Sequence, residues 1–189
     1  MSFDTTHINR HRHRFEGSDC VWLFAYGSLI FRPDFAFIEC QRASIRGWTR
    51  KFWQGSHDHR GTPQSPGRVA TLIPAADQVC DGMAYLITPA VFDHLDDREK
   101  NGYLRVLTEL CFDDGSSASG LVYIADADNA AYLGPASDQA IAQQIAKASG
   151  PSGTNRAYLL QLADALRAQG SIDLHVFAIE QHLLQTDAG

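Results

Sequence analysis

The chain has 189 residues, of which 44% are hydrophobic and 10% aromatic. A chain of this length buries about 70% of its unfolded surface, so the composition excludes a mainly disordered protein. The formal charge of −6 argues against a protein whose main partner is nucleic acid. No apolar run approaches the roughly 18 residues that cross a bilayer, and the polar start lacks a signal-peptide core. We therefore expect a soluble cytoplasmic protein with a small-molecule partner and no membrane partner.

The first nineteen residues are rich in His and Arg and are predicted to be a flexible basic tail, followed by a single domain over residues 20–187. His11 and His13 suggest a metal site, but a stable site needs four fixed ligands and nothing here fixes them. The tail is the favoured interpretation. The widely spaced Cys20, Cys40, Cys80 and Cys111 contain no CxxC pair and are predicted to be reduced core thiols.

Strands are predicted where apolar and aromatic runs end at glycine, proline or aspartate. The run from Cys20 to Tyr26 reads as a buried strand that leads into the tight Gly27-Ser28 loop. A hairpin is predicted across the Asp113-Asp114-Gly115 turn. The remaining expected strands cover residues 44–54, 68–73, 82–87, 103–112 and 119–124.

Helices gather in the last third of the chain. Ser137 caps one predicted helix, Thr154 or Asn155 opens a second and Asp173 a third, while Thr88-Pro89 begins an earlier short helix. Strands first and helices last favour an α+β fold over a doubly wound sheet. We predict a small mixed-strand β-barrel flanked by α-helices.

The segment Tyr26-Gly27-Ser28-Leu29 is the first candidate for chemistry. Glycine lets the backbone approach a ligand, and consecutive N–H groups in such a turn can bind a carboxylate or an oxyanion. An ordinary strand-to-loop turn explains the same residues.

Glu99 is the second candidate and lies in the charged run Asp96-Asp97-Arg98-Glu99-Lys100. Most charge runs are solvated turns. Here, however, Asp96 and Asp97 fall near a helix C-terminus, where the helix dipole disfavours negative charge. Such a broken local rule is typical of functional sites.

Residues 48–63 combine aromatic and basic side chains, a pattern that single-stranded nucleic-acid grooves use. The acidic chain and the short stretch favour a small anionic ligand instead. His57 and His59 are possible metal ligands, but no third ligand lies nearby in the sequence. Neither a Gly-x-Ser-x-Gly elbow nor a phosphate-binding loop is present.

Six blocks in collinear order resemble the ChaC family over roughly residues 21–185. They are Phe24-Ala25-Tyr26-Gly27-Ser28-Leu29-Ile30, Arg50-Lys51-Phe52-Trp53-Gln54-Gly55-Ser56, the block formed by residues 58–63 and 66–72, Leu95-Asp96-Asp97-Arg98-Glu99-Lys100-Asn101-Gly102-Tyr103, Tyr132-Leu133-Gly134-Pro135 and Gly150-Pro151-Ser152-Gly153-Thr154-Asn155. One such block is weak evidence, whereas six in order are specific. Ala25 departs from the glycine usual in this family.

The resemblance implies a glutathione-specific γ-glutamylcyclotransferase, a carbon–nitrogen lyase of the amidine-lyase class. It implies no metal and no cofactor, and cleavage of glutathione to 5-oxoproline and cysteinylglycine. Glu99 matches the family's catalytic glutamate. The expected substrate-binding residues are Phe24, Ala25, Tyr26, Gly27, Ser28, Leu29, Gln54, Arg68 and Tyr158, with Arg50 a further candidate because a guanidinium binds a carboxylate through two hydrogen bonds. We expect a monomer or a weak homodimer.

The implied chemistry agrees with the residue types. The α-amine of a γ-glutamyl group can attack its own γ-carbonyl, and correct orientation of such an attack is worth roughly 7–11 kcal/mol. One carboxylate can take the amine proton and give it to the leaving nitrogen, provided that desolvation raises its pKa above the ordinary value of about 4.3. Alternatives are a cyclotransferase for other γ-glutamyl amines or amino acids, a non-catalytic regulator of cation transport and, last, a nucleic-acid binder.

Overall fold

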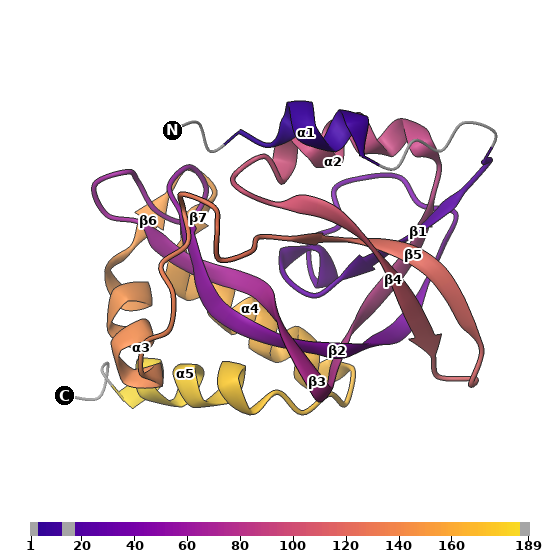
Figure 1. The fold of residues 1–189 in the computed structure, drawn as a ribbon. Helices are drawn as coiled ribbons and strands as arrows, with labels where there is room; N and C mark the ends of the chain where they lie inside the picture. The colour runs from indigo at the N-terminus through magenta and orange to yellow at the C-terminus, as the bar shows by residue number, and fades with distance from the viewer. Residues whose placement is uncertain (1–3, 13–17, 186–189) are drawn as a thin grey trace. The chain divides into compact units, whose positions relative to one another are not determined.

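The computed structural model describes residues 4–12 and 18–185 (Figure 1). Among these residues, none of the helices has the length and apolar character that crossing a membrane requires. The elements in chain order are α1 Thr6–His11, β1 Val21–Ala25, the 3-10 turn η1 Ser28–Ile30, β2 Glu39–Ser56, β3 Gly67–Ile87, the 3-10 turn η2 Pro89–Val91, α2 Phe92–Arg98, β4 Leu104–Phe112, β5 Ser117–Ile124, α3 Asp138–Lys147, β6 Ser149–Gly150, β7 Gly153–Thr154, α4 Asn155–Ala168 and α5 Leu174–Gln185.

Contacts within the chain divide it into two compact units. The barrel unit comprises residues 1–49 and 72–130, and the helical unit comprises residues 50–71 and 131–189. Both β2 and β3 begin in one unit and end in the other. The single domain predicted over residues 20–187 stays a prediction.

The sheet closes into a barrel with the strand order β1-β3-β2-β4-β5. β1 runs antiparallel to β3 and parallel to β5, while β4 and β5 form the predicted antiparallel hairpin. Leu23 and Phe24 of β1 are at most 2% exposed, as the apolar run of this strand requires. The predicted mixed-strand barrel and the α+β class are confirmed.

The longest strand differs from the prediction. Residues 68–73 and 82–87 were expected as two strands on either side of Pro74, whereas β3 runs unbroken from Gly67 to Ile87. Its middle is exposed and polar around Asp77 and Gln78, which is the composition of a loop. The backbone nevertheless continues as one strand through this part, although its side chains do not show a strand pattern.

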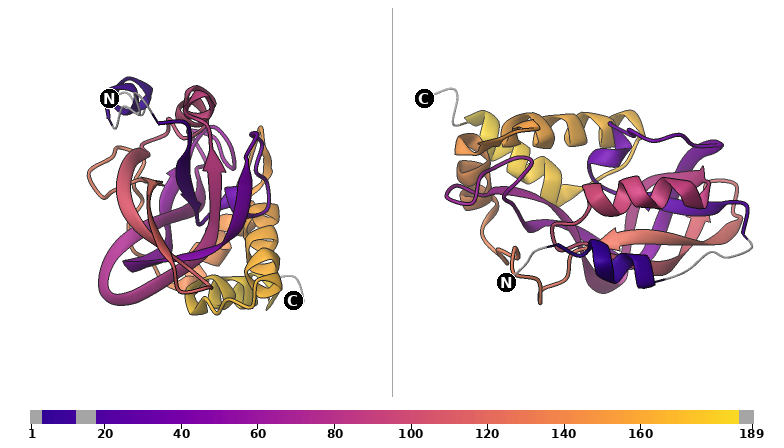
Figure 2. Two further views of the ribbon diagram at one scale, coloured as in Figure 1. Left: turned by 90° about the vertical axis from the view of Figure 1, so that its right-hand side faces the viewer. Right: turned by 90° about the horizontal axis from the view of Figure 1, so that it is seen from above.

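Figure 2 shows the helices of the helical unit, α3, α4 and α5, coloured orange to yellow. They begin at the caps that the sequence predicts. The side chains of Ser137 and Thr154 accept the N–H groups of Ala140 and Ala157, and Oδ1 of Asp173 accepts that of Val176. These caps satisfy N–H groups that the first helical turn leaves unpaired. The fully buried side chains of these helices are Ile141, Ile145, Leu159, Leu162, Ala163, Leu166, Val176, Ile179 and Leu183.

The loop between β2 and β3 is closed tightly at its base. A Cβ atom on Gly61 would lie 2.1 Å from the backbone nitrogen of Gly67, and one on Gly150 would lie 2.4 Å from the carbonyl oxygen of His59. Real side chains do not tolerate such distances to backbone, so this base requires glycine. By contrast, residues 62–65 at the loop tip are exposed.

Two predictions about residue environment are wrong in part. Residues 6–11 of the expected flexible tail form α1, and Asn9 within it is fully buried. The side chains of Thr5 and Asn9 bind this polar segment to backbone oxygens of the barrel unit. His13 and Arg14 of the tail lie outside the described residues. All four cysteines are free, but only Cys80 is buried, while Cys20 and Cys40 are exposed.

Candidate active site

The predicted ligand-binding loop follows β1 directly and is anchored by two tyrosines. Tyr26 donates its hydroxyl to the carbonyl oxygen of Tyr123 at 2.7 Å, and Tyr85 donates to that of Leu29 at 2.9 Å. Burial raises the pKa of Tyr85 to about 12, with a smaller contribution from the nearby Cys40, so its hydroxyl remains a donor. The first N–H groups of the turn at Ser28 have no acceptor inside the turn itself. Phe24 and Ala25 lie buried in β1, and Gly27 precedes η1.

Glu99 occupies the position that directly follows α2. Its N–H group donates to Leu95 at 2.8 Å, and its carbonyl oxygen accepts from Tyr103 at 3.3 Å. Its side chain is only 17% exposed, so the carboxylate is not in bulk water. Gly102, in the same turn, has φ of +89°, and a Cβ there would lie 2.7 Å from the side-chain oxygen of Asn129. Both facts require glycine at this position.

Arg98 joins Glu99 to the loop after β1. Its Nε lies 3.4 Å from Oε1 of Glu99, and its Nη2 donates to Oγ of Ser28 at 2.8 Å. Nη1 lies 2.5 Å from Oδ1 of Asp34. Burial would raise the pKa of Asp34, but the hydrogen bond and the charge of Arg98 outweigh it, so the pKa is lower than usual. The two predicted parts of the site are therefore brought together by one guanidinium.

Asp96 has a different role from Glu99. It is fully buried and accepts two hydrogen bonds from Arg105, at 2.9 and 2.5 Å, and one from the hydroxyl of Tyr123 at 2.6 Å. Burial, together with the bond to Asp96, raises the pKa of Tyr123. Asp96, although it lies near the end of α2, is therefore part of a buried hydrogen-bond network with Arg105 and Tyr123. Its neighbour Asp97 is exposed and contacts Lys100 at 3.2 Å.

In the helical unit, Arg68 is buried without a carboxylate partner. Its Nε donates to Oε1 of Gln144 at 2.7 Å, and Nη1 donates to the carbonyl oxygens of Phe52 and Gly134 at 3.0 and 2.9 Å. Within residues 4–12 and 18–185 no acidic group pairs with this guanidinium and its Nη2 makes no hydrogen bond. Burial lowers the pKa of Arg68.

The other predicted residues of the helical unit, and Asn155 beside them, are also buried. Asn155 fixes its backbone through two hydrogen bonds, at 2.6 Å to the N–H group and 2.8 Å to the carbonyl oxygen of Arg68. The hydroxyl of Tyr158 accepts the N–H group of Ala70 at 3.3 Å. Gln54 is fully buried and bridges to Tyr132. Arg68, Gln54 and Tyr158 are therefore all buried within the helical unit.

Arg50 contrasts with Arg68, although both were candidates for a substrate carboxylate. Its Nη1 lies 2.5 Å from Oδ2 of Asp173, and its side chain is 2% exposed. The guanidinium is therefore already neutralised by the protein, and it is not the arginine that the structure favours for substrate. Residue type alone does not report a partner 123 positions away.

The histidines considered as metal ligands have other surroundings. Nδ1 of His59 lies 3.0 Å from Oγ of Ser152, and its Nε2 lies 3.8 Å from Asp58. No group of three His, Cys, Asp or Glu side chains suited to a metal ion occurs in the part of the chain that the structure describes. His13 lies outside that part.

Sequence reasoning missed Arg98 and Asp34. Arg98 lies inside the charged run next to Glu99, where it resembles one more solvated charge. The available signal was its place in the motif that resembles the ChaC family. Asp34 lies in a loop with no recognised pattern, and only the fold brings it to Arg98.

The chain is similar to known proteins over most of its length. The ChaC-like protein family matches residues 21–186. "Gamma-glutamylcyclotransferase 2-3" of Arabidopsis thaliana is 46% identical, over 82% of this chain and 84% of its own length. "Glutathione-specific gamma-glutamylcyclotransferase 1" of Danio rerio is 41% identical, over 90% of this chain and 92% of its own.

A crystal structure of the yeast γ-glutamylcyclotransferase specific to glutathione is similar to this chain in fold. It has a TM-score of 0.83 at 30% sequence identity and covers 89% of this chain and 97% of its own. Sequence and fold therefore agree over most of the length of both proteins. The chain belongs to the ChaC-like protein family.

Proposed function

We propose that this protein is a γ-glutamylcyclotransferase that cleaves glutathione to 5-oxoproline and cysteinylglycine. The observation that carries the proposal is the largely buried Glu99 carboxylate beside Arg98, whose other nitrogen binds Ser28 of the loop after β1. The names of the Danio rerio and yeast relatives support the choice of substrate.

The reaction is an intramolecular exchange at the γ-carbonyl carbon. The α-amine of the γ-glutamyl group forms the new C–N bond and closes a five-membered ring, and the bond from the same carbon to the cysteine nitrogen breaks. One proton leaves the amine and one reaches the departing nitrogen. Water is neither consumed nor released, so the two products together contain all atoms of the substrate.

Glu99 carries the proton in this mechanism. Its carboxylate accepts a proton from the attacking amine and delivers it to the leaving nitrogen, which is general base and then general acid catalysis by one group. The adjacent Arg98 guanidinium, whose Nε lies 3.4 Å from Oε1 of Glu99, fixes the direction of the carboxylate. The protein therefore supplies orientation and one proton carrier.

The backbone of the loop at Tyr26–Leu29 stabilises the charge that develops during attack. The N–H groups of its turn, which the turn leaves unpaired, donate to the γ-carbonyl oxygen as it becomes an oxyanion. The tyrosine anchors at Tyr26 and Leu29 hold these donors before substrate arrives. Phe24 and Ala25 form the buried base from which the loop departs.

Arg68 binds a carboxylate of the substrate, with Gln54 and Tyr158 completing the polar surroundings. A buried guanidinium that is held by neutral acceptors retains its full charge, and a carboxylate is the complementary ligand. Glutathione has two carboxylates and offers such a group.

The decisive experiment follows 5-oxoproline release from glutathione by the purified protein and by Glu99→Gln. The amide keeps the size of the side chain and removes its basicity, so we expect kcat to fall by about 10²-fold or more. Glu109→Gln is the matched control, because Glu109 is an exposed glutamate of β4. A folded Glu99→Gln protein with the kcat of the parent would falsify the mechanism.

A second candidate is a cyclotransferase for other γ-glutamyl compounds. The Arabidopsis thaliana relative, at 46% identity, carries a name that does not mention glutathione. A panel of γ-glutamyl amines and γ-glutamyl dipeptides decides between the two, and a higher kcat/KM on any of them than on glutathione would favour the second. Tight binding of glutathione without turnover would instead favour a regulatory role.

The setting of the enzyme is also a proposal. We propose a cytoplasmic monomer or weak homodimer that uses neither membrane nor nucleic acid, which is supported by the charge of −6. Sedimentation over a range of protein concentrations, together with cell fractionation, tests both statements.

A further inference from the structure

The short helix α1 lies outside the segment that matches the ChaC-like family, since that match begins at residue 21. It lies beside α2, the helix that ends at Glu99 (Figures 1 and 2). Both elements belong to the barrel unit. The described part of this segment runs from Asp4 to Arg12. Its hydrogen bonds converge on a few residues that follow Glu99.

Thr5 binds the turn that carries Glu99. Its N–H group donates to the carbonyl oxygen of Lys100 at 2.9 Å, and its hydroxyl lies 3.0 Å from that oxygen and 2.8 Å from the carbonyl oxygen of Tyr103. Asp4 extends the contact as an isolated antiparallel bridge to Asn101. The backbone on the C-terminal side of Glu99 is therefore bound at successive positions.

Asn9 binds the next residues as a strand would. Its Nδ2 donates to the carbonyl oxygen of Tyr103 and its Oδ1 accepts the N–H group of Arg105, both at 2.9 Å. These two backbone groups flank Leu104, the first residue of β4. The residues of β4 that pair with β2 are Cys111 and Phe112, at the opposite end of the strand. The side-chain amide thus replaces a missing strand partner. Because Asn9 is fully buried, water cannot take over its bonds.

The same residues connect to the carboxylate network under the site. Arg105, whose N–H group Asn9 accepts, holds Asp96 of α2 through its guanidinium. The nitrogens Nη1 of Arg12 and of Arg105 also donate to each other's carbonyl oxygens, at 3.3 and 3.4 Å. Glu99 therefore lies between α2 and residues 100–105. Hydrogen bonds from α1 to residues 100–105, and from Arg105 to Asp96 of α2, connect these two segments.

We propose that Asn9 and Thr5 of α1 are positioning residues for Glu99. They restrain the turn at residues 99–103, so that the carboxylate is held in the geometry that proton transfer needs. The inference rests on the proposed role of Glu99. It assigns a function in catalysis to a segment outside the family match, and it needs no contact of α1 with substrate.

The test compares Asn9→Ala with the parent in 5-oxoproline release from glutathione. A displaced general base costs turnover more than binding, so we expect kcat to fall by about tenfold or more with KM within about twofold. Asn9→Asp keeps the shape but places a carboxylate oxygen against the carbonyl of Tyr103, and we expect it to lose kcat as well. If side-chain volume alone mattered, Asn9→Asp would behave as the parent does. His7→Ala is the control, because His7 is exposed on the same helix and contacts only His11 by its ring.

Amide hydrogen exchange supplies a readout that does not depend on activity. We expect faster exchange in residues 99–105 of Asn9→Ala, with unchanged exchange in β1 and β5. Parent values of both kcat and exchange in Asn9→Ala, or a rise in KM alone, would overturn the inference. If Asn9→Ala does not fold, Thr5→Val, which removes one hydroxyl, replaces it and is judged by the same two criteria. A parent protein without activity would refute the proposed function, whereas an active parent with an unaffected Asn9→Ala would refute only the role of α1.

Discussion

Two buried arginines, one in each unit, are held in opposite ways. Arg105 of the barrel unit is 5% exposed and faces the Asp96 carboxylate through two hydrogen bonds, with its guanidinium 4.2 Å from the centre of the Phe92 ring. Arg68 of the helical unit is 7% exposed, and its guanidinium donates to neutral oxygens. Among the described residues, the first guanidinium has a carboxylate partner and the second has none.

The difference separates a structural cation from a binding cation. An ion pair buried with all its hydrogen bonds has no further demand for an anion, whereas an uncompensated buried charge is costly until an anion reaches it. The neutral acceptors keep the Arg68 side chain in place without lowering its attraction for a carboxylate. Substitutions at each arginine site test this difference. A buried histidine and the capped helix ends show further ways in which the protein satisfies polar groups.

The largest expected effect is the loss of the compensated pair. Asp96→Ala leaves the Arg105 guanidinium buried without a counter-charge, and we expect the free energy of unfolding to fall by about 3–5 kcal/mol. Urea unfolding of the parent and the variant measures it. The double variant Asp96→Leu with Arg105→Met removes both charges and should recover most of the loss. Equal stability of Asp96→Ala and the parent would contradict the structural role.

Arg68→Met tests the uncompensated charge. We expect KM for glutathione to rise by about tenfold, because a charged hydrogen bond to a carboxylate is worth roughly 1.5–3 kcal/mol. The free energy of unfolding should fall by less than in Asp96→Ala, because removal of the buried uncompensated charge offsets the loss of hydrogen bonds at Gln144, Phe52 and Gly134. Initial rates against glutathione concentration give the answer. Lys147→Met, which removes an exposed cation of the same unit, should leave KM unchanged.

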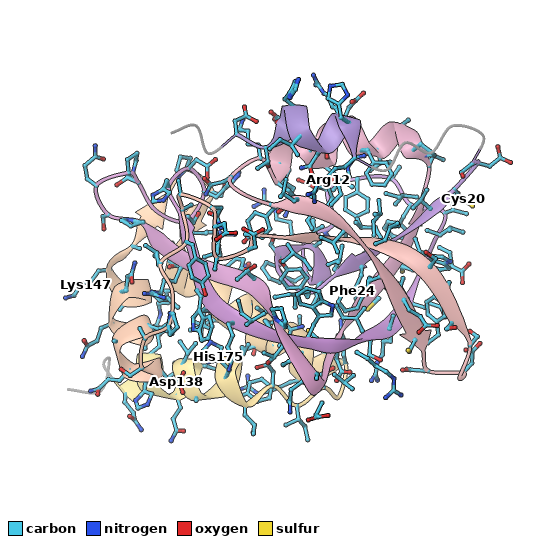
Figure 3. The ribbon with its side chains drawn as sticks, viewed as in Figure 1. Arg12, Cys20, Phe24, Asp138, Lys147 and His175 are labelled. Carbon is cyan, nitrogen blue, oxygen red and sulfur yellow. The ribbon has the colours of Figure 1, made fainter. Side chains whose placement is uncertain are left out.

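His175 shows a third way to bury a basic group, which is to keep it neutral. Its Nε2 accepts the N–H group of Phe52 at 3.1 Å, while Nδ1 faces Asp138 at 3.0 Å (Figure 3). Burial, with a smaller contribution from the charge of Lys51, lowers the pKa of His175 below its ordinary value of 6.5 although Asp138 and Asp173 oppose this. The unfolded chain therefore binds a proton that the folded protein does not.

Stability should accordingly fall as the pH drops below about 6.5, with a slope from this residue of at most about 1.4 kcal/mol per pH unit. Denaturant titrations of the parent and of His175→Gln between pH 5 and pH 7 measure the difference. The amide oxygen of glutamine can accept the same N–H group but does not titrate, so the variant should show a flatter dependence. Parallel curves would mean that His175 is not the group responsible.

The smallest effect concerns helix ends. α3 begins at a serine cap, whereas α2 has no side-chain cap. Ser137→Ala should lower the free energy of unfolding by about 1 kcal/mol, with enzyme activity unchanged. Thermal unfolding followed by circular dichroism measures it. Ser149→Ala, at an exposed serine of the same unit, is the control, and an equal loss there would contradict the role of the cap.

Local patterns predicted most of the fold. β1, the β4–β5 hairpin and the three capped helices follow from apolar runs, a turn and cap residues, all of which lie within a few positions of one another. The continuous β3 did not follow, because its exposed and polar middle has the side-chain composition of a loop. Side-chain patterns therefore predict an element well only where the pattern extends over its whole length.

The site shows the same limit. Glu99 and the Tyr26 loop were found through motifs, but Arg98, which connects them, was hidden among other charges. Arg50 and Arg68 are both arginines, and only the fold reveals that Asp173 forms an ion pair with Arg50. Asn9 lies in a segment whose polar composition does not predict burial. Its side-chain amide nevertheless forms hydrogen bonds with two backbone groups about 95 positions away. Partners far apart in sequence carry no local signal.

The tight base of the loop between β2 and β3 has an evolutionary consequence. Gly61 and Gly150 leave no room for a side chain, while residues 62–65 at the tip face solvent. Selection on folding should therefore act more strongly on the two glycines of the base than on the exposed residues of the tip. New recognition properties can arise there by drift, without any cost to the architecture that carries the loop.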